Sequence, residues 1–300
     1  MAESRARRRK KSKARQILDT YVIEPLKIIA RNKAGLIGFI GLIIYILMAT
    51  VGPILVPLDM QAKPNQMYLP PSWEHPLGTD SEGRDIFSQI VNGASDVLFV
   101  AFLAGVITVV IATLLGTIAG FKGGAVDAII MAIDDILLTI PQFPLLSVLS
   151  ALVSLDNLTL ASIIGLLSWP ALARAIRSQV LSVKSRDFIE AARALDLGTR
   201  HIVFTEIMPN LMSYIVVSLI FAMTGAVYAQ VGLVFLGFVP FESQNWGVMI
   251  NLAWTRGAIF FKDSIYYILA PILAISGFQL SAIMFSRALE EIFNPRLREG

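Results

Sequence analysis

Three aspartates are the residues best placed to do chemistry in this apolar chain. Asp127, Asp134 and Asp135 precede a long charge-free run, and an ionisable group inside a membrane span is a functional candidate by default. Asp134 and Asp135 could serve a membrane-embedded enzyme such as an intramembrane hydrolase. As sequence neighbours they point about 100° apart on a helix, which is poor geometry for flanking one substrate atom. We therefore expect interfacial solvation or pairing with Arg174 or Arg177, and keep the membrane-embedded enzyme as an alternative.

Other residue types that build active sites are scarce. The chain has no cysteine, which excludes disulfides, thiol nucleophiles and thiolate metal sites. His75 and His201 are expected on opposite membrane faces, so we predict no catalytic or metal-binding histidine cluster. The sequence has no GxxxxGK[ST] loop, so this chain is not expected to bind nucleotide phosphates as a P-loop does.

Composition predicts a membrane protein. Apolar residues make up 55% of the chain and charged residues 16%, and the apolar residues occur in blocks long enough to cross the hydrocarbon, which takes about 20 residues. Pro141 and Pro144 are expected to kink the third block. The pairs Gly35/Gly38 and Gly116/Gly120 suit close helix packing. We predict an all-α membrane protein with six transmembrane helices at about 34–56, 97–121, 127–155, 157–181, 209–236 and 264–287.

The positions of the basic residues predict the orientation. Of the 25 Lys and Arg, 21 fall in four segments, 1–33, 122, 174–208 and 287–300. Lys and Arg are enriched on the cytoplasmic side, so both termini are expected in the cytoplasm and the chain in the cell (inner or plasma) membrane. Residues 1–33 are interpreted as a basic tail and an interfacial elbow helix that contact lipid, not nucleic acid. A proton-coupled carrier working alone would need buried midplane charges and repeat symmetry, and neither is evident.

The polar segment 187–210 between two predicted spans is typical of a pair of short helices. Asp187 is expected to cap the first, at about 188–196, with Glu190 completing an acidic capping box. Gly198 is expected to end it in the left-handed conformation, before a second helix at 199–208. The first helix carries an apolar stripe formed by Phe188, Ala191, Ala192 and Leu195. This stripe has little to pack on outside the bilayer, so we predict a docking element, the alternative being an ordinary surface connection.

This segment, EAARALDLGTRHIVFTEIMPN, resembles the EAA loop of binding-protein-dependent ABC transporter permeases, which inserts a coupling helix into a cytoplasmic ATPase subunit. The family's usual glycine aligns with Asp196, whereas this chain has its glycine at Gly198. The resemblance implies a cytoplasmic coupling-helix hairpin over 187–208 within one ABC permease domain, 34–300. The implied ATPase-coupling residues are Asp187, Phe188, Glu190, Ala191, Ala192, Leu195, Asp196 and Gly198.

Two further blocks resemble the dipeptide/oligopeptide (peptide/nickel) branch of these permeases. They are HPLGTDSEGRDIFSQIVNGASDVLFVAF at 75–102 and LVFLGFVPFESQNWGVMI at 233–250. The resemblance implies a permease subunit, not an enzyme, that imports small peptides, with oligosaccharides or nickel complexes as alternatives. The implied partners are a second homologous permease subunit, two cytoplasmic ATPases that bind ATP and Mg²⁺, and an extracytoplasmic solute-binding protein.

Two sets of residues are candidates for contact with substrate or binding protein. Trp169, Tyr228 and Gln230 could line a polar translocation path, although aromatic residues in spans more often pack or anchor. The branch's GTD…GRD motif falls in the long outer loop 57–96, and we favour tight turns in which Asp side chains cap backbone amides. The alternative is a landing surface for the solute-binding protein. The residues of this motif are Gly78, Thr79, Asp80, Gly83, Arg84 and Asp85.

Overall fold

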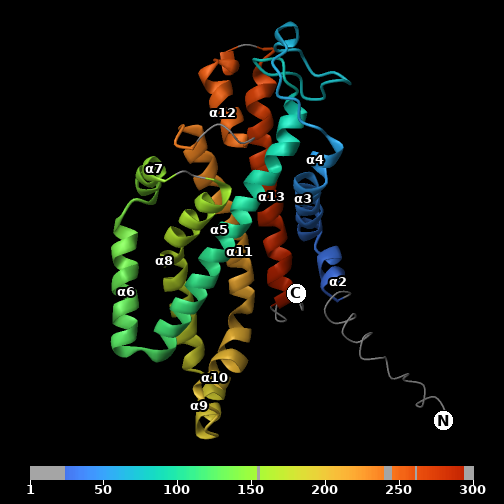
Figure 1. The fold of residues 1–300 in the computed structure, drawn as a ribbon. Coiled ribbons are helices and arrows are strands. Elements are labelled where there is room, and N and C mark those ends of the chain that lie inside the picture. The colour runs from blue at the N-terminus through green and yellow to red at the C-terminus, as the bar shows by residue number, and fades with distance from the viewer. Residues whose placement is uncertain (1–23, 154–155, 240–244, 261, 294–300) are drawn as a thin grey trace, which may run out of the picture.

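The computed structural model describes residues 24–153, 156–239, 245–260 and 262–293. The predicted basic tail at 1–15 and the start of the elbow helix lie outside these residues. The elements are helical (Figure 1), with the bounds α2 Glu24–Arg31, α3 Lys33–Thr50, α4 Gly52–Leu55, η2 Pro64–Gln66, α5 Ile86–Lys122, α6 Gly124–Thr139, α7 Gln142–Leu152, α8 Asn157–Lys184, α9 Asp187–Ala194, α10 Thr199–His201, η3 Ile202–Ile207, α11 Met208–Phe235, α12 Trp246–Thr255, η4 Ala258–Phe260 and α13 Ile265–Phe293.

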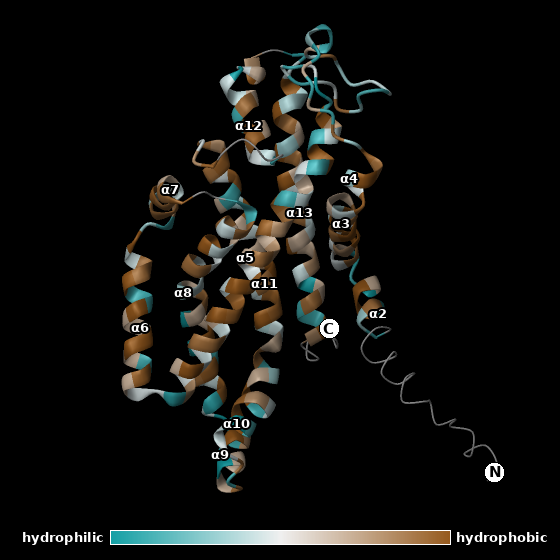
Figure 2. Ribbon diagram, viewed as in Figure 1, coloured by the Kyte–Doolittle hydropathy of each residue, from teal (hydrophilic) through white to brown (hydrophobic). Residues whose placement is uncertain are grey.

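The helices confirm the all-α membrane fold. Among the described residues, five helical runs are long and apolar enough to cross a membrane, and the bent pair α6–α7 makes a sixth if it is one span. Figure 2 shows apolar residues along the middle of the bundle and polar residues gathered in the outer loop and around α9. The bundle thus has a wide apolar belt with polar ends.

The second span begins earlier than predicted. Helix α5 starts at Ile86, because the Asp85 side chain accepts a hydrogen bond from the Ser88 amide at 2.6 Å and so caps the helix. Residues 86–96 of the predicted outer loop are therefore helical. The first span is shorter than predicted, since α3 ends at Thr50 and α4, with Pro53 in its first turn, follows as a separate short helix.

The third span is broken rather than merely kinked. Helices α6 and α7 meet at an angle of 81°. Ile140, the residue before Pro141, has an extended backbone (φ −86°, ψ 119°), as expected where the proline ring clashes with a preceding helical residue. The predicted helix 127–155 is thus two helices, which lie at one side of the bundle, next to α8 (Figure 1).

Close backbone contacts hold the bundle together at the predicted glycines. A Cβ atom on Gly116 of α5 would lie 2.5 Å from the Ala173 carbonyl oxygen of α8, and one on Gly120 would lie 2.9 Å from the Arg177 carbonyl oxygen. On the other side of the bundle, a Cβ on Gly38 of α3 would lie 2.4 Å from the Phe285 amide nitrogen of α13. Only glycine permits these approaches, which is how small residues associate helices in lipid.

Substitution of Gly116 by Ala should therefore destabilise the α5–α8 contact by about 1–3 kcal/mol, because the added methyl group overpacks a backbone crossing. Thermal unfolding in detergent would measure the loss. The matched control is Gly225→Ala on α11, where an added Cβ meets nothing within 4 Å. Equal stability of the two variants would contradict this account of the packing.

Candidate functional site

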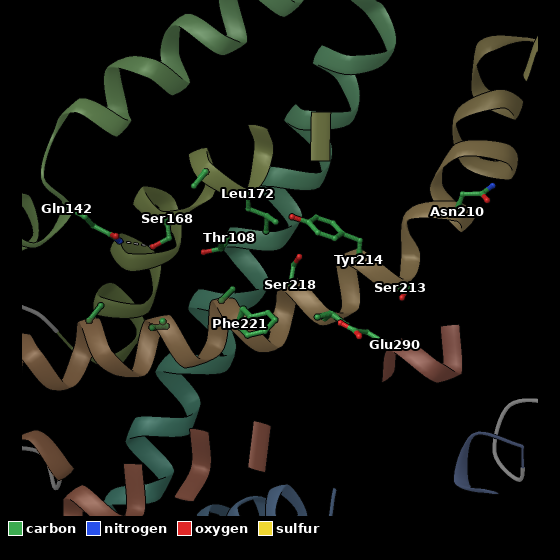
Figure 3. A pocket seen from close by; sticks show the side chains of 16 residues that line it. Thr108, Gln142, Ser168, Leu172, Asn210, Ser213, Tyr214, Ser218, Phe221 and Glu290 are labelled. Atoms are coloured by element: carbon green, nitrogen blue, oxygen red, sulfur yellow. Dashed lines mark hydrogen bonds between the residues drawn. The ribbon is translucent and has the colours of Figure 1, made fainter. Parts of the chain in front are cut away.

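A cavity of about 750 Å³ lies between α5, α7, α8, α11 and α13. Its polar lining residues are Thr108, Gln142, Ser168, Asn210, Ser213, Tyr214, Ser218 and Glu290. Figure 3 shows the Tyr214, Ser218 and Thr108 side chains near one another, with Gln142 and Ser168 to one side and Glu290 to the other. The polar part of the lining thus consists of hydroxyl and amide groups with one carboxylate, and apolar side chains such as Leu172 and Phe221 make up the rest.

Part of this lining is held in place by hydrogen bonds. The Gln142 side-chain amide donates to the Ser168 hydroxyl at 2.7 Å, which ties the start of α7 to the middle of α8. The Ser168 hydroxyl donates in turn to the Ile164 carbonyl at 2.6 Å. The break after α6 therefore turns a polar side chain, Gln142, toward the cavity.

The predicted path residues do not line this cavity. Trp169 is 7% exposed and packs in the core with Ala112 and Ala173, and Tyr228 is 55% exposed. Gln230 is fully buried, and neither polar atom of its amide has a partner among the described residues. Their role in translocation stays a prediction.

The sequence held a signal for the lining that we missed. The polar residues of α11 that line the cavity include Asn210, Tyr214 and Ser218, each four residues from the next, with Ser213 three residues after Asn210. Such spacing places side chains on one side of a helix. A polar stripe inside an apolar span would have indicated a wet surface.

The acidic residues of α6 pair with arginines of α8. Arg174 Nη2 lies 2.6 Å from Asp134 Oδ2 and 2.5 Å from Asp135 Oδ1, and Arg177 Nε lies 2.5 Å from Asp127 Oδ1. The predicted pairing is confirmed, so these carboxylates are engaged in holding α6 against α8. One oxygen of the buried Asp134, Oδ1, has no partner among the described residues.

Helix α9 projects from the end of the bundle beyond α8 (Figure 1) and has two distinct faces. Ile189 and Ala192 are buried and join the core cluster formed with α8 and η3. Leu195 is 72% exposed and Phe188 36% exposed, and Ala191 is also exposed. The predicted stripe is therefore divided, with Ala192 facing the bundle.

Two predictions about this segment were wrong, and a third was right only in part. Asp187 is the first residue of α9 and not its cap, since Arg186 holds the cap position and makes no side-chain cap hydrogen bond. Residues 199–207 are helical as predicted, but α10 and η3 continue into α11 and form one run from Thr199 to Phe235. Gly198 does not supply the left-handed residue; that residue is Asp196, with φ +52°.

Asp196 occupies the left-handed position of a complete Schellman motif. The Leu197 amide donates to the Ala192 carbonyl at 3.1 Å, and the Asp196 amide donates to the Arg193 carbonyl at 2.9 Å. These two bonds define the motif. The residue in the left-handed conformation at this position is usually glycine. The structure thus adopts the turn that a glycine at position 196 would favour, although the chain has aspartate there.

The outer-loop motif folds as the predicted tight turns. Asp80 is fully buried, and its Oδ1 accepts from the Glu82 and Arg84 amides at 2.8 and 2.9 Å. Its Oδ2 accepts from Arg84 Nε at 2.8 Å and from Gln89 Nε2 at 3.0 Å. Burial by itself lowers the pKa of Arg84, but the Asp80 carboxylate outweighs it and holds that pKa above its usual value.

Glycines and Thr79 complete the turn. Gly78 and Gly83 have φ values of +78° and +76°, and a Cβ on Gly83 would lie 2.1 Å from the Lys63 carbonyl oxygen. The Thr79 hydroxyl donates to the Gln66 carbonyl. The motif therefore ties the outer loop to the start of α5.

Comparison with known proteins identifies the family. The family model described as binding-protein-dependent transport system inner membrane component matches residues 112–299, more than half of the chain. The chain belongs to this family. A second model, N-terminal TM domain of oligopeptide transport permease C, matches residues 26–71 of the permease.

Relatives cover most of the permease. A putative peptide permease protein of Brucella suis biovar 1 (strain 1330) is 32% identical over 272 residues, which cover 89% of this chain and 88% of that protein. The dipeptide transport system permease protein DppC of Bacillus subtilis (strain 168) is 32% identical over 236 residues, 77% of this chain and 73% of DppC. The oligopeptide transport system permease protein OppC of the same organism is 30% identical over 276 residues, covering 89% and 87%. The permease is thus a multi-pass transport subunit of the ABC importer type, as the resemblance implied.

Replacing Asp196 by Gly should stabilise the α9 turn by about 0.5–1 kcal/mol, because glycine adopts the left-handed region without the Cβ clash. Amide hydrogen exchange over residues 187–198 should become slower. Asp196→Ala, which keeps the Cβ and cannot hydrogen-bond locally, should make exchange faster. A change in the same direction for both variants would contradict the assignment.

Proposed function

We propose that this permease forms half of the translocation pathway of an ATP-driven importer of small peptides, with a second homologous permease subunit as the other half. The single observation that carries this proposal is a cavity in an apolar bundle to which polar side chains contribute half of the lining residues. Polar groups facing hydrocarbon without partners are costly. A second helix bundle that closes the cavity around water would remove that cost and enclose a path for a polar solute.

Small peptides fit the chemistry of the lining. The relatives are named as peptide, dipeptide and oligopeptide permeases. Hydroxyl and amide groups such as Ser168, Ser218 and Gln142 can donate to and accept from peptide bonds whatever the peptide's side chains. Oligosaccharides and nickel complexes are the alternative cargoes.

Helix α9 suits the role of a coupling element to one of the two ATPase subunits, which would bind ATP and Mg²⁺. Ile189 and Ala192 fix the helix to the bundle core, while Phe188 and Leu195 expose apolar surface at its outer side. A helix fixed on one face and exposed on the other can transmit a rigid movement from a partner to the bundle. This role requires α9 and both chain termini to face the cytoplasm, as the distribution of basic residues predicts.

The rival enzyme role has less support. Asp127, Asp134 and Asp135 are each engaged by Arg174 or Arg177, and no second carboxylate or histidine from another helix pairs with them in the described residues. Structural ion pairs explain these aspartates without catalysis.

Reconstitution would test the proposed activity. Proteoliposomes that contain this permease, its partner permease, the ATPases and the solute-binding protein should accumulate labelled di- and oligopeptides only when ATP is hydrolysed. Labelled maltooligosaccharides and nickel complexes should not accumulate. Uptake of either in place of peptides would overturn the substrate class, and uptake without ATP would overturn the mechanism.

Ala191→Trp should abolish ATP-driven uptake without loss of folded protein, because Ala191 is exposed on α9 and a bulky side chain there would obstruct a partner groove. The assays are uptake and co-purification of the ATPases. Arg193→Trp is the matched control, since residue 193 lies about 160° from residue 191 around the helix. Ala192 is unsuitable for this test, since it is buried and a large residue would disturb the core. Normal uptake by Ala191→Trp would contradict docking at this face.

A further inference from the structure

The outer loop exposes large apolar side chains. Trp73 is 103% exposed, Met67 47% and Leu69 37%. Tryptophan is the residue most often found as an anchor at protein interfaces and is rarely left without contacts on a soluble surface. A wholly exposed tryptophan therefore indicates something outside this chain that covers it.

The outer loop lies too far from the bilayer for lipid to cover Trp73. The charge-free part of α5 begins at Val97. At the same level, Asp96 Oδ1 accepts from Asn157 Nδ2 at 2.8 Å, where α8 begins. Residues 86–96 therefore extend beyond the hydrocarbon by about 16 Å along the helix axis. The headgroup layer on each side is only about 5–8 Å deep.

Trp73 is attached to the far end of that extension. It lies in a turn closed by the Ser72 amide, which donates to the His75 carbonyl at 2.8 Å. His75 Nδ1 in turn lies 3.1 Å from Asp85 Oδ1, and Asp85 caps α5. The turn is thus fixed at the start of α5, and Figure 1 shows the outer loop at the end of the molecule opposite α9.

The scaffold beneath the turn is rigid. The buried Asp80 carboxylate makes four hydrogen bonds, and the Thr79 amide donates to the Leu69 carbonyl at 3.1 Å. Farther down α5, Trp246 Nε1 of α12 donates to the Ile90 carbonyl at 3.0 Å. A loop backbone held on such a base loses little conformational entropy when a partner binds.

We propose that Trp73 is the anchor with which this permease holds an extracytoplasmic solute-binding protein, together with the exposed Met67 and Leu69 of the same loop. The proposal rests on the proposed function, because it takes the partner to be the binding protein of an importer. It assigns the contact to the apolar turn, while the GTD…GRD residues act as its scaffold.

The charge of the loop defines the partner surface further. Segment 57–96 holds six acidic and two basic residues. Asp80 is neutralised by Arg84 in the interior, whereas Glu74, next to Trp73, is exposed and has no ion-pair partner within the described residues. The complementary surface is an apolar pocket for the indole ring with a basic rim.

Trp73→Ala should weaken binding of the solute-binding protein that supports uptake by at least about tenfold, as expected for an anchor residue. Affinity would be measured with the complete importer in nanodiscs, with binding-protein-stimulated ATP hydrolysis as a second readout. Trp73→Phe should retain most of the affinity. The matched control is Phe102→Ala, because Phe102 is 55% exposed on the apolar part of α5 and faces no water-borne partner.

A label at position 74, next to Trp73, would show whether the binding protein or lipid covers Trp73. The chain has no cysteine, so Glu74→Cys carries a fluorophore at one exposed position of this subunit and keeps the Trp73 side chain. The fluorophore should respond to the binding protein and to a water-soluble quencher, and not to a nitroxide carried by lipid. Quenching by the lipid nitroxide, or unchanged affinity in Trp73→Ala, would overturn the proposal. Absence of ATP hydrolysis and uptake with the wild-type chain would instead contradict the proposed function.

Discussion

The direct contact between the backbones of α5 and α8 is the constraint on which the other features of this permease depend. At Gly116 and Gly120 the two helices approach so closely that no side chain fits between them. In lipid the hydrophobic effect does not drive helices together, so close packing and interhelical polar contacts must do so. Helix α8 is thereby fixed, and it carries three functional features: the Ser168 wall of the cavity, the arginines that hold α6, and the connection to α9.

Several polar groups in this molecule are paired within the chain, whereas both polar atoms of the buried Gln230 amide have no partner among the described residues. Within the bundle, the Asp–Arg pairs between α6 and α8 neutralise each other near one edge of the apolar belt. In the outer loop, the buried Asp80 carboxylate has two backbone amides and two side chains as donors. The cavity adds a third set of polar side chains, such as Tyr214 and Ser218, and the proposed wet pathway would account for their position in an apolar bundle.

The two ends of the molecule are built on the same principle. At one end α9 has a buried face that contains Ile189 and an exposed face that contains Leu195. At the other end the loop buries Asp80 and exposes Trp73. In each case a well-packed base holds the backbone that carries an exposed apolar side chain. Such preorganisation lowers the entropic cost of association and suits contacts that must form and break during each transport cycle.

The sequence alone determined the membrane class, the approximate spans and the family, while for the three aspartates it left interfacial solvation or pairing with Arg174 or Arg177 open. The first two follow from patterns that are local and strongly constrained, since an apolar run of sufficient length crosses the hydrocarbon. The tertiary structure decided the rest. The left-handed residue of the α9 turn is Asp196 and not Gly198, because the Schellman hydrogen bonds fix where the helix ends whatever residue is there. Only packing shows that Ala192 faces inward and Ala191 outward, and that the cavity lies along the polar face of α11, since burial depends on neighbours distant in the sequence.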